Sequence, residues 1–286
     1  PVAMLSIVAT ETSVLTFISV PGLAYRDDWF FLQLAIGYII GRILVSLFLL
    51  PQYFKLGVTS IYEIIGHKFG LDMQKVASGL FLITRILADG IRFLATAVVV
   101  QVITGWSLSS AVIIIGVVTL VYTLSGGIRT VIWVDSIQFI LYLFGGIASI
   151  IIVLSHLNQS LFEAIPILAE QGKLAIFNLE GNIIKDPYYF ITAIVGGAIL
   201  SFSSHGVDYM MVQRVLATKN LTAARKAMVG SGLFVFIQFG IFLLAGSLIY
   251  LLMGGVEVER DREFTSFIVN YLPIGLKGIL LAGVLS

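Results

Sequence analysis

The chain contains a succession of apolar runs, each long enough or nearly long enough to cross the hydrocarbon core of a membrane. A helix needs about 20 mostly apolar residues for such a crossing. Lipid offers no partner for an open strand edge, so spans of this kind must be helices. The sequence therefore predicts an all-α polytopic membrane protein. The runs are 3–20, 29–50, 76–103, 108–125, 131–154, 189–211, 227–253 and the beginning of an eighth at 274–286.

Composition agrees with a lipid environment. Hydrophobic residues make up 58% of the chain, charged residues 12%, and the mean hydropathy is +1.03. A soluble domain carries about 25% charged residues, so this chain lacks the polar residues to cover its own surface. The absence of cysteine excludes disulfides and thiol chemistry. No basic stripe with interleaved aromatic residues occurs, so a nucleic-acid partner is not expected.

The connections between the runs predict the orientation in the membrane. Cytoplasmic loops are enriched in Lys and Arg, and one alternate set of loops shows this enrichment. That set contains Lys55, Lys68, Lys75, Arg129, Arg214, Lys219, Arg225 and Lys226. Turn residues between runs occur at 21–22, 105, 126–127 and 254–255. The segments 156–187 and 257–273 are then expected outside, each with a short surface helix, at 161–171 and 263–271.

Polar side chains gather in the middle of the first run, where lipid would exclude them. They are Thr10, Glu11, Thr12, Ser13 and Thr16. One or two hydroxyls could bond back to their own helix. So many together, with a carboxylate among them, indicate an unwound stretch that lines a cavity.

A second such region opens in the sixth run. The segment 196–208 is rich in glycine and hydroxyl side chains, and it also carries His205 and Asp208. Interrupted spans in the first and sixth positions are typical of an inverted five-plus-five repeat with its site at the membrane midplane. Freed carbonyls of a broken helix bind a small cation, while hydroxyls and half-helix N-termini hold a solute. We interpret His205 as a packed side chain in preference to a proton carrier.

Charges also lie in the third run. Arg85, Asp89 and Arg92 are spaced i, i+4 and i+7, which places them on one face of a helix. We interpret them as an internal ion network, because a transport pathway would more often leave a carboxylate unpaired.

Several passages resemble one family, the sodium:solute symporters. The segments 6–13 (SIVATETS) and 21–25 (PGLAY) are similar to the family's first core helix and its exit. The segment 122–138 resembles the signature between its fourth and fifth helices. The segments 206–217 and 272–282 resemble the end of the sixth helix and the approach to the eighth.

The resemblance implies a helical core of ten spans in two inverted repeats, of the leucine-transporter type, preceded by one further helix. We expect residues 1–286 to form a single transmembrane transporter domain, incomplete at both ends. Its first repeat would occupy 1–155, with core helices one to five. A partial second repeat would occupy 188–286, with core helices six and seven and the start of the eighth.

The resemblance also implies a sodium site. Backbone carbonyls at Ala9 and Thr12 match the family's ligands on the first helix, and the remaining ligands on the eighth helix would lie beyond Ser286. Asp135 matches the family's acidic residue on the sodium exit path, although a structural pair with Arg129 would explain it equally well. The resemblance implies that sodium is the coupling ion, and no other cofactor is expected.

Solute contacts are implied on the first, second and sixth helices. The matching positions are Thr16, Ala35, Tyr38, Ser201 and Ser204. Ala35 and Ser204 replace a carboxylate and a large aromatic residue that the family's sugar carriers use, which argues against galactose-like recognition. Glu11, beside the cation, is unusual at a position that is commonly an amide or a small residue. The closer branch is that of the iodide, monocarboxylate and vitamin carriers.

These features predict sodium-coupled symport of a small organic solute or anion across the cytoplasmic membrane by alternating access. Proton-coupled symport through Glu11 and a sensor domain fused to a histidine kinase are the alternatives. A membrane enzyme is disfavoured, because no metal-ligand or nucleophile motif is found.

Overall fold

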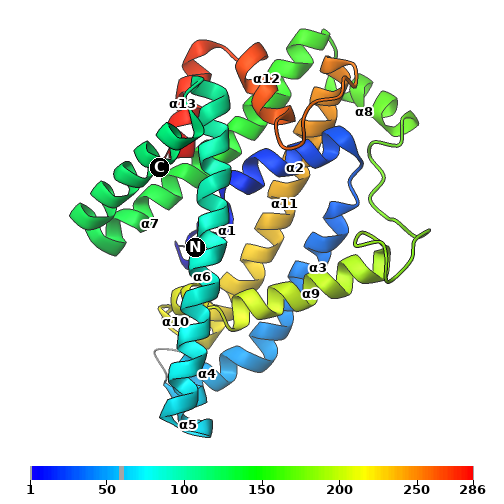
Figure 1. The fold of residues 1–286 in the computed structure, drawn as a ribbon. Helices are drawn as coiled ribbons and strands as arrows, with labels where there is room; N and C mark the ends of the chain where they lie inside the picture. The colour runs from blue at the N-terminus through cyan, green and yellow to red at the C-terminus, as the bar shows by residue number, and fades with distance from the viewer. Residues whose placement is uncertain (1, 58–60, 286) are drawn as a thin grey trace. The chain divides into compact units, whose positions relative to one another are not determined.

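The computed structural model describes residues 2–57 and 61–285, without the side chains of 2, 122, 125–132, 135 and 281–285. All regular secondary structure among these residues is helical, as the sequence predicts (Figure 1). In chain order the helices are α1 (Val2–Glu11), α2 (Val14–Arg26), α3 (Phe31–Leu44), the π-helix η1 (Val45–Leu49), α4 (Leu50–Leu56), α5 (Ile61–Phe69), α6 (Leu71–Thr104), α7 (Leu108–Leu157), α8 (Leu161–Glu170), α9 (Phe190–Gly206), α10 (Tyr209–Leu216), α11 (Leu221–Met253), α12 (Glu263–Tyr271) and α13 (Ile274–Leu285).

The predicted interruption of the first span is confirmed. Helix α1 ends at Glu11, α2 begins at Val14, and the two helices meet at an angle of 66°. Ser13 adopts an extended backbone conformation, and its hydroxyl accepts a hydrogen bond from the Thr16 N–H. Because Ser13 caps α2 in this way, the chain leaves one helix and starts another within two residues.

The sixth predicted span is also interrupted, but at the end of its glycine-rich segment. Helix α9 continues to Gly206, and α10 leaves it at an angle of 65°. Asp208 caps α10 by accepting hydrogen bonds from the N–H groups of Met210 and Met211. The prediction that the whole stretch 196–208 is unwound is therefore wrong in its extent. The break itself comprises only Val207 and Asp208.

Four helical segments of the described chain are long and apolar enough to cross a membrane without a break. They are Phe31–Leu56, Leu71–Thr104, Ser136–Leu157 and Leu221–Met253. Counting each bent pair as one span raises the number to six. The shorter apolar helix Leu108–Val121 falls within the fourth predicted run. The turns predicted at Pro21–Gly22 and Gly126–Gly127 are wrong, because the first pair lies inside α2 and the second inside α7. The predicted runs 108–125 and 131–154 therefore lie in one continuous helix.

Both predicted surface helices are present, as α8 and α12. Ser160 and Glu163 form a reciprocal capping box at the start of α8. At its end, the N–H groups of Gly172 and Lys173 donate to the carbonyls of Ala169 and Leu168. This pairing is a Schellman motif, with Gly172 in the left-handed conformation that it requires (φ +72°).

The chain forms two compact units, each built from three segments. Unit 1 comprises 1–10, 32–91 and 177–236, and unit 2 comprises 11–31, 92–176 and 237–286. Unit 1 has an apolar core formed by α1, the segment η1–α4 and helices α10 and α11, with Ile7, Val45 and Met228 fully buried. In unit 2, Phe17 stacks on Tyr142 with ring centroids 4.7 Å apart. The assignment of repeats at 1–155 and 188–286 stays a prediction.

Candidate functional site

In unit 2, the break of the first span is attached to α11 by a buried hydrogen bond. The Thr12 hydroxyl lies 3.1 Å from both the Gln238 side-chain oxygen and its nitrogen. The exposed fraction is 5% for Thr12 and 1% for Gln238. Because the Thr12 side chain is engaged with Gln238, what the break can offer to a ligand at Thr12 is its backbone.

Helix α2 then packs along α11 in parallel register. Phe17 contacts Phe242 with ring centroids 5.7 Å apart. A Cβ atom at Gly246 would lie only 2.0 Å from the Pro21 carbonyl oxygen, so the two backbones approach closely there. Only glycine permits this approach. The two helices are thus held together from the break towards the end of α2.

The last turn of α1 and the break place backbone carbonyls inside the first span. The last four carbonyls of an α-helix have no partner within the helix, and Ala9 is among those of α1. Ala9 is buried, and Glu11, the last residue of α1, is partly buried. Carbonyl oxygens of this kind, together with hydroxyls, are the hard oxygen ligands that a sodium ion accepts. Thr16, in the first turn of α2, is partly buried and donates its N–H to Ser13.

In unit 1, three of the predicted solute residues lie together. The Ser201 hydroxyl donates to the Tyr38 carbonyl at 3.0 Å, and Ser201 is buried. The Ser204 hydroxyl lies 3.4 Å from the Ser201 carbonyl and 2.9 Å from His205 Nδ1. His205 is buried, which agrees with its interpretation as a packed side chain.

Close packing of α3 on α9 produces this proximity. A Cβ atom at Gly37 would lie 2.3 Å from the Ile194 carbonyl oxygen, and one at Gly41 would lie 2.4 Å from that of Ala198. A Cβ atom at Gly197 would lie 2.4 Å from the Leu34 carbonyl oxygen. Small residues at such positions allow membrane helices to approach closely.

The predicted residues therefore form two groups, each described within its own unit. Ala9, Tyr38, Ser201 and Ser204 belong to unit 1. Glu11, Thr12 and Thr16 belong to unit 2. Asp135 lies in α7, and its side chain is outside the described part of the structure.

The expected ion network of α6 is present in part. Arg85 Nε lies 2.8 Å from an oxygen of Asp89, and Arg85 Nη1 lies 3.8 Å from an oxygen of Asp208. Arg85 thereby connects α6 to the residue that caps α10 at the second break. The sequence indicated the pair on α6 but not the partner on the sixth span, because helical spacing predicts only neighbours on the same helix.

Two further polar residues were missed. Gln238 is an amide in the middle of the apolar run 227–253, and that isolation was the available signal. Tyr53, in α4, donates its hydroxyl to the Gly206 carbonyl at 2.7 Å and so satisfies the end of α9. A tyrosine near the end of an apolar run gives no comparable signal, since such residues are common at membrane interfaces.

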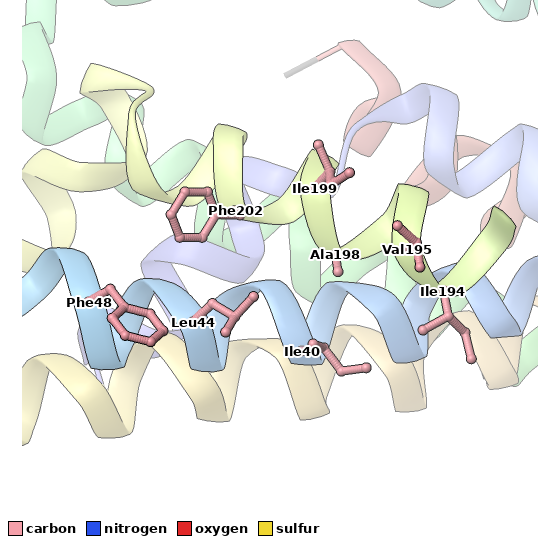
Figure 2. A pocket seen from close by; sticks show the side chains of 8 residues that line it. All are labelled: Ile40, Leu44, Phe48, Ile194, Val195, Ala198, Ile199 and Phe202. Atoms are coloured by element: carbon pink, nitrogen blue, oxygen red, sulfur yellow. The ribbon is translucent and has the colours of Figure 1, made fainter. Parts of the chain in front are cut away.

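An apolar groove in unit 1 is a separate feature (Figure 2). It has a volume of about 610 Å³ and is lined by Ile40, Leu44, Phe48, Ile194, Val195, Ala198, Ile199 and Phe202. Phe48 and Ile199 are more than half exposed. The lining has no polar side chain, so the groove provides no ligand for an ion or for a charged solute.

Comparison with known proteins gives a consistent result. The model of the sodium:solute symporter family matches residues 1–286. Sodium-coupled monocarboxylate transporter 1 of Mus musculus is 30% identical, over 85% of this chain and 39% of its own length. The sodium/iodide cotransporter of Homo sapiens is 28% identical, over 85% of this chain and 36% of its own length.

A solved structure agrees in fold. A Na⁺-coupled sialic acid symporter in a substrate-bound outward-open state matches with a TM-score of 0.88 and 24% identity. The match covers 99% of this chain and 61% of that one. The chain thus spans about two fifths of the length of the transporters above and a larger share of the solved symporter.

Proposed function

The chain belongs to the sodium:solute symporter family, and from this premise we propose that the full-length protein carries out sodium-coupled symport. The transported species would be a small organic solute or anion. The membrane would be the cytoplasmic one, and transport would proceed by alternating access, with the broken helices forming the site. The relatives named for monocarboxylate and iodide suggest the chemical class to test first.

The observation that carries this proposal is the break at Thr12–Ser13. Helix α1 ends at Glu11, inside a span, and α2 starts at Val14, so the backbone of Thr12 and Ser13 is non-helical within the apolar run. The Thr12 hydroxyl is bonded to Gln238, which keeps the backbone of the break in place. We assign sodium to the carbonyls of Ala9 and Thr12, and Asp135 to the path by which the ion leaves.

The solute is assigned to Glu11 and Thr16 at the first break and to Tyr38, Ser201 and Ser204 near the second. The Ser201 hydroxyl gives its hydrogen to the Tyr38 carbonyl, so its oxygen can accept a hydrogen bond from a solute. Position 35 is a buried alanine and offers no carboxylate to sugar hydroxyls. This arrangement supports a small solute in preference to a hexose.

Glu11 leads to the second candidate function, proton-coupled symport. A partly buried carboxylate at the break could increase the affinity for sodium, or it could itself carry the coupling proton. Only the first role makes uptake depend on sodium. The second predicts uptake that follows pH and persists without sodium.

The test is uptake by the full-length protein in liposomes, screened over small organic anions, sugars and amino acids. An inward sodium gradient should drive accumulation of one class, and replacing sodium by choline should abolish it. Glu11→Gln should raise the sodium concentration required for half-maximal uptake. Equal sodium dependence in wild type and Glu11→Gln would remove Glu11 from the mechanism. Uptake driven by a pH gradient alone would favour the proton-coupled alternative.

A further inference from the structure

Lys173 is a buried cation that the assigned sodium and solute site does not use. Its exposed fraction is 8%. Its ammonium group donates to three consecutive carbonyls, those of Tyr25 at 2.9 Å, Arg26 at 3.0 Å and Asp27 at 3.0 Å. An ammonium group has three hydrogens, so Lys173 has none left for a solute.

The three carbonyls belong to the C-terminal end of α2. These groups have no partner within the helix, and the negative end of the helix dipole favours a cation there. Lys173 thus caps α2 from a different part of the chain. The Schellman motif at the end of α8 fixes the Lys173 backbone, because its N–H is the one that donates to Leu168.

The aromatic ring of Tyr250, in α11, contacts the same ammonium group. Lys173 Nζ lies 4.0 Å from the centre of the ring, a cation–π contact. The ring also packs edge-on against Tyr25, with centroids 5.7 Å apart. A Cβ atom at Gly255 would lie 2.8 Å from the Tyr250 ring, so the loop after α11 closes tightly over it.

Charged groups surround this contact. Asp27 and Asp28 attract the ammonium group, but burial has the larger effect and lowers the pKa of Lys173 below its ordinary value. Arg26 forms an ion pair with buried Glu263 of α12. The end of α2 is therefore attached to α12 as well as to Lys173.

Helix α2 is consequently held to α11 at three levels. The first is Thr12–Gln238 at the break, the second is the close approach of Pro21 to Gly246, and the third is the contact of Lys173 with the helix end and Tyr250. A tilt of α2 about the middle contact would have to break a contact at each end. The position of the break is thus mechanically coupled to Lys173, although the two lie at opposite ends of α2.

We propose that Lys173 is a positioning residue for the cation site: by clamping the outer end of α2 onto α11, it fixes the geometry of the break at Thr12. This inference rests on the proposed sodium site at the break. It assigns to the segment between α8 and α9 a role in sodium affinity, with no contact between that segment and the ion.

The test compares Lys173→Met with Lys185→Met in the full-length protein. Lys185 is exposed and lies in the same segment, so its substitution controls for loss of a positive charge there. Lys173→Met should raise the sodium concentration for half-maximal uptake about fivefold or more. A fivefold change is about the smallest that is typical of coupling between two distant sites. The maximal rate per folded molecule should change less. Lys185→Met should resemble the wild type.

A second readout does not depend on transport. The chain has no cysteine, so Leu15→Cys, partly exposed in the first turn of α2, reports the break through its rate of maleimide modification. Lys173→Met should change that rate and its response to sodium. If Lys173 has only a structural role, Lys173→Met will lower the yield of folded protein. The sodium half-saturation and the labelling rate of the folded fraction will then stay unchanged, and this result would overturn the proposal.

If Lys173→Met does not fold, Tyr250 provides the decisive pair. Tyr250→Leu removes the ring beneath the ammonium group, and Tyr250→Phe retains it. The leucine variant should shift sodium half-saturation and labelling, while the phenylalanine variant should not; equal behaviour of the two would overturn the proposal. Wild-type uptake that does not depend on sodium would instead refute the proposed function. In that case, the labelling experiment would still test whether Lys173 positions the break.

Discussion

The side chain and the backbone of Thr12 have separate roles at the break. The hydroxyl is buried against Gln238, and the backbone carbonyl is the group assigned to sodium. A buried hydrogen bond between two side chains holds a backbone geometry that the chain would otherwise not keep within a span. This separation makes the two roles distinguishable by mutation.

Thr12→Ala should lower stability more than sodium affinity. The substitution leaves the buried Gln238 amide without this partner, which costs about 1–3 kcal/mol. Sodium half-saturation of the folded protein should rise by no more than about fivefold, a free-energy difference of about 1 kcal/mol, because the carbonyl assigned to sodium is kept and only its positioning is loosened. Thermal unfolding in detergent and sodium-dependent uptake measure the two effects, and Thr12→Ser is the control that keeps the hydroxyl. A large loss of sodium affinity in a stable Thr12→Ala protein would assign the hydroxyl to the ion.

The stability of the first turn of α8, the helix that precedes Lys173, should depend on pH because of Glu163. Its pKa is lowered from the ordinary value of 4.5, first by the Ser160 N–H and then by the Ser160 hydroxyl. A carboxyl group with a lowered pKa stabilises the folded form above its ordinary pKa, and this contribution is lost as pH falls through the folded value. Amides in the first turn of α8 should therefore lose protection from hydrogen exchange, relative to amides late in the helix, when pH falls well below 4.5.

The matched variant is Glu163→Gln, whose amide oxygen can still accept from Ser160 but does not titrate. In this variant, the relative protection of the first turn should not vary over the same pH range. Unchanged pH dependence in Glu163→Gln would show that another group causes it.

At the scale of the helix, glycine has two opposite uses in this protein, and composition does not separate them. The segment 196–208 predicted an interruption, and one occurs, but Gly197 lies in a regular helix and serves close packing on α3. Whether a glycine breaks a helix or allows another to approach depends on the neighbouring backbone, which is a tertiary property. Gly196 and Gly197 both lie within α9, and only Gly197 faces a neighbouring backbone.

Gly197→Ala should destabilise unit 1, whereas Gly196→Ala should not. A Cβ atom at Gly197 would lie 2.4 Å from the Leu34 carbonyl oxygen, and one at Gly196 would meet no atom within 4 Å. The first substitution forces α3 and α9 apart, at a cost of about 1–3 kcal/mol for overpacking. The second should be neutral or stabilising, because alanine is the better helix former by about 1 kcal/mol. Thermal unfolding of both variants measures the difference, and equal effects would show that α3 and α9 do not approach this closely.

Prediction from the sequence succeeded where a local pattern determines the structure. Long apolar runs gave the helices of the spans, the cluster around Glu11 gave the first break, and the helices expected in the segments 156–187 and 257–273 are α8 and α12. It failed where a distant partner decides. Gln238 and Lys173 acquire their roles from the start and end of α2, more than a hundred residues away in the chain, and no sequence spacing relates such groups.

At the scale of the whole molecule, the two compact units do not follow the order of the chain. Each unit takes three separate segments, and the first passage between units falls at Thr10–Glu11, at the end of α1 and just before the break. Both units therefore depend on contacts between residues far apart in sequence. What the chain order does predict is which loops share a side of the membrane, since every complete span reverses the side.

That sidedness is the last prediction, and the absence of cysteine makes it directly measurable. Lys219 lies in the short connection between α10 and α11, and Arg214, Arg225 and Lys226 flank that connection. Ile184 lies in the segment between α8 and α9, where Lys173 and Lys185 are accompanied by Glu180 and Asp186. Both positions are exposed, so Lys219→Cys and Ile184→Cys should be tolerated. In intact cells, a membrane-impermeant maleimide should modify Ile184→Cys and should modify Lys219→Cys only after permeabilisation. The reverse result would invert the orientation and place the Lys173 clamp on the cytoplasmic side, where it could not hold the outer half of the first span.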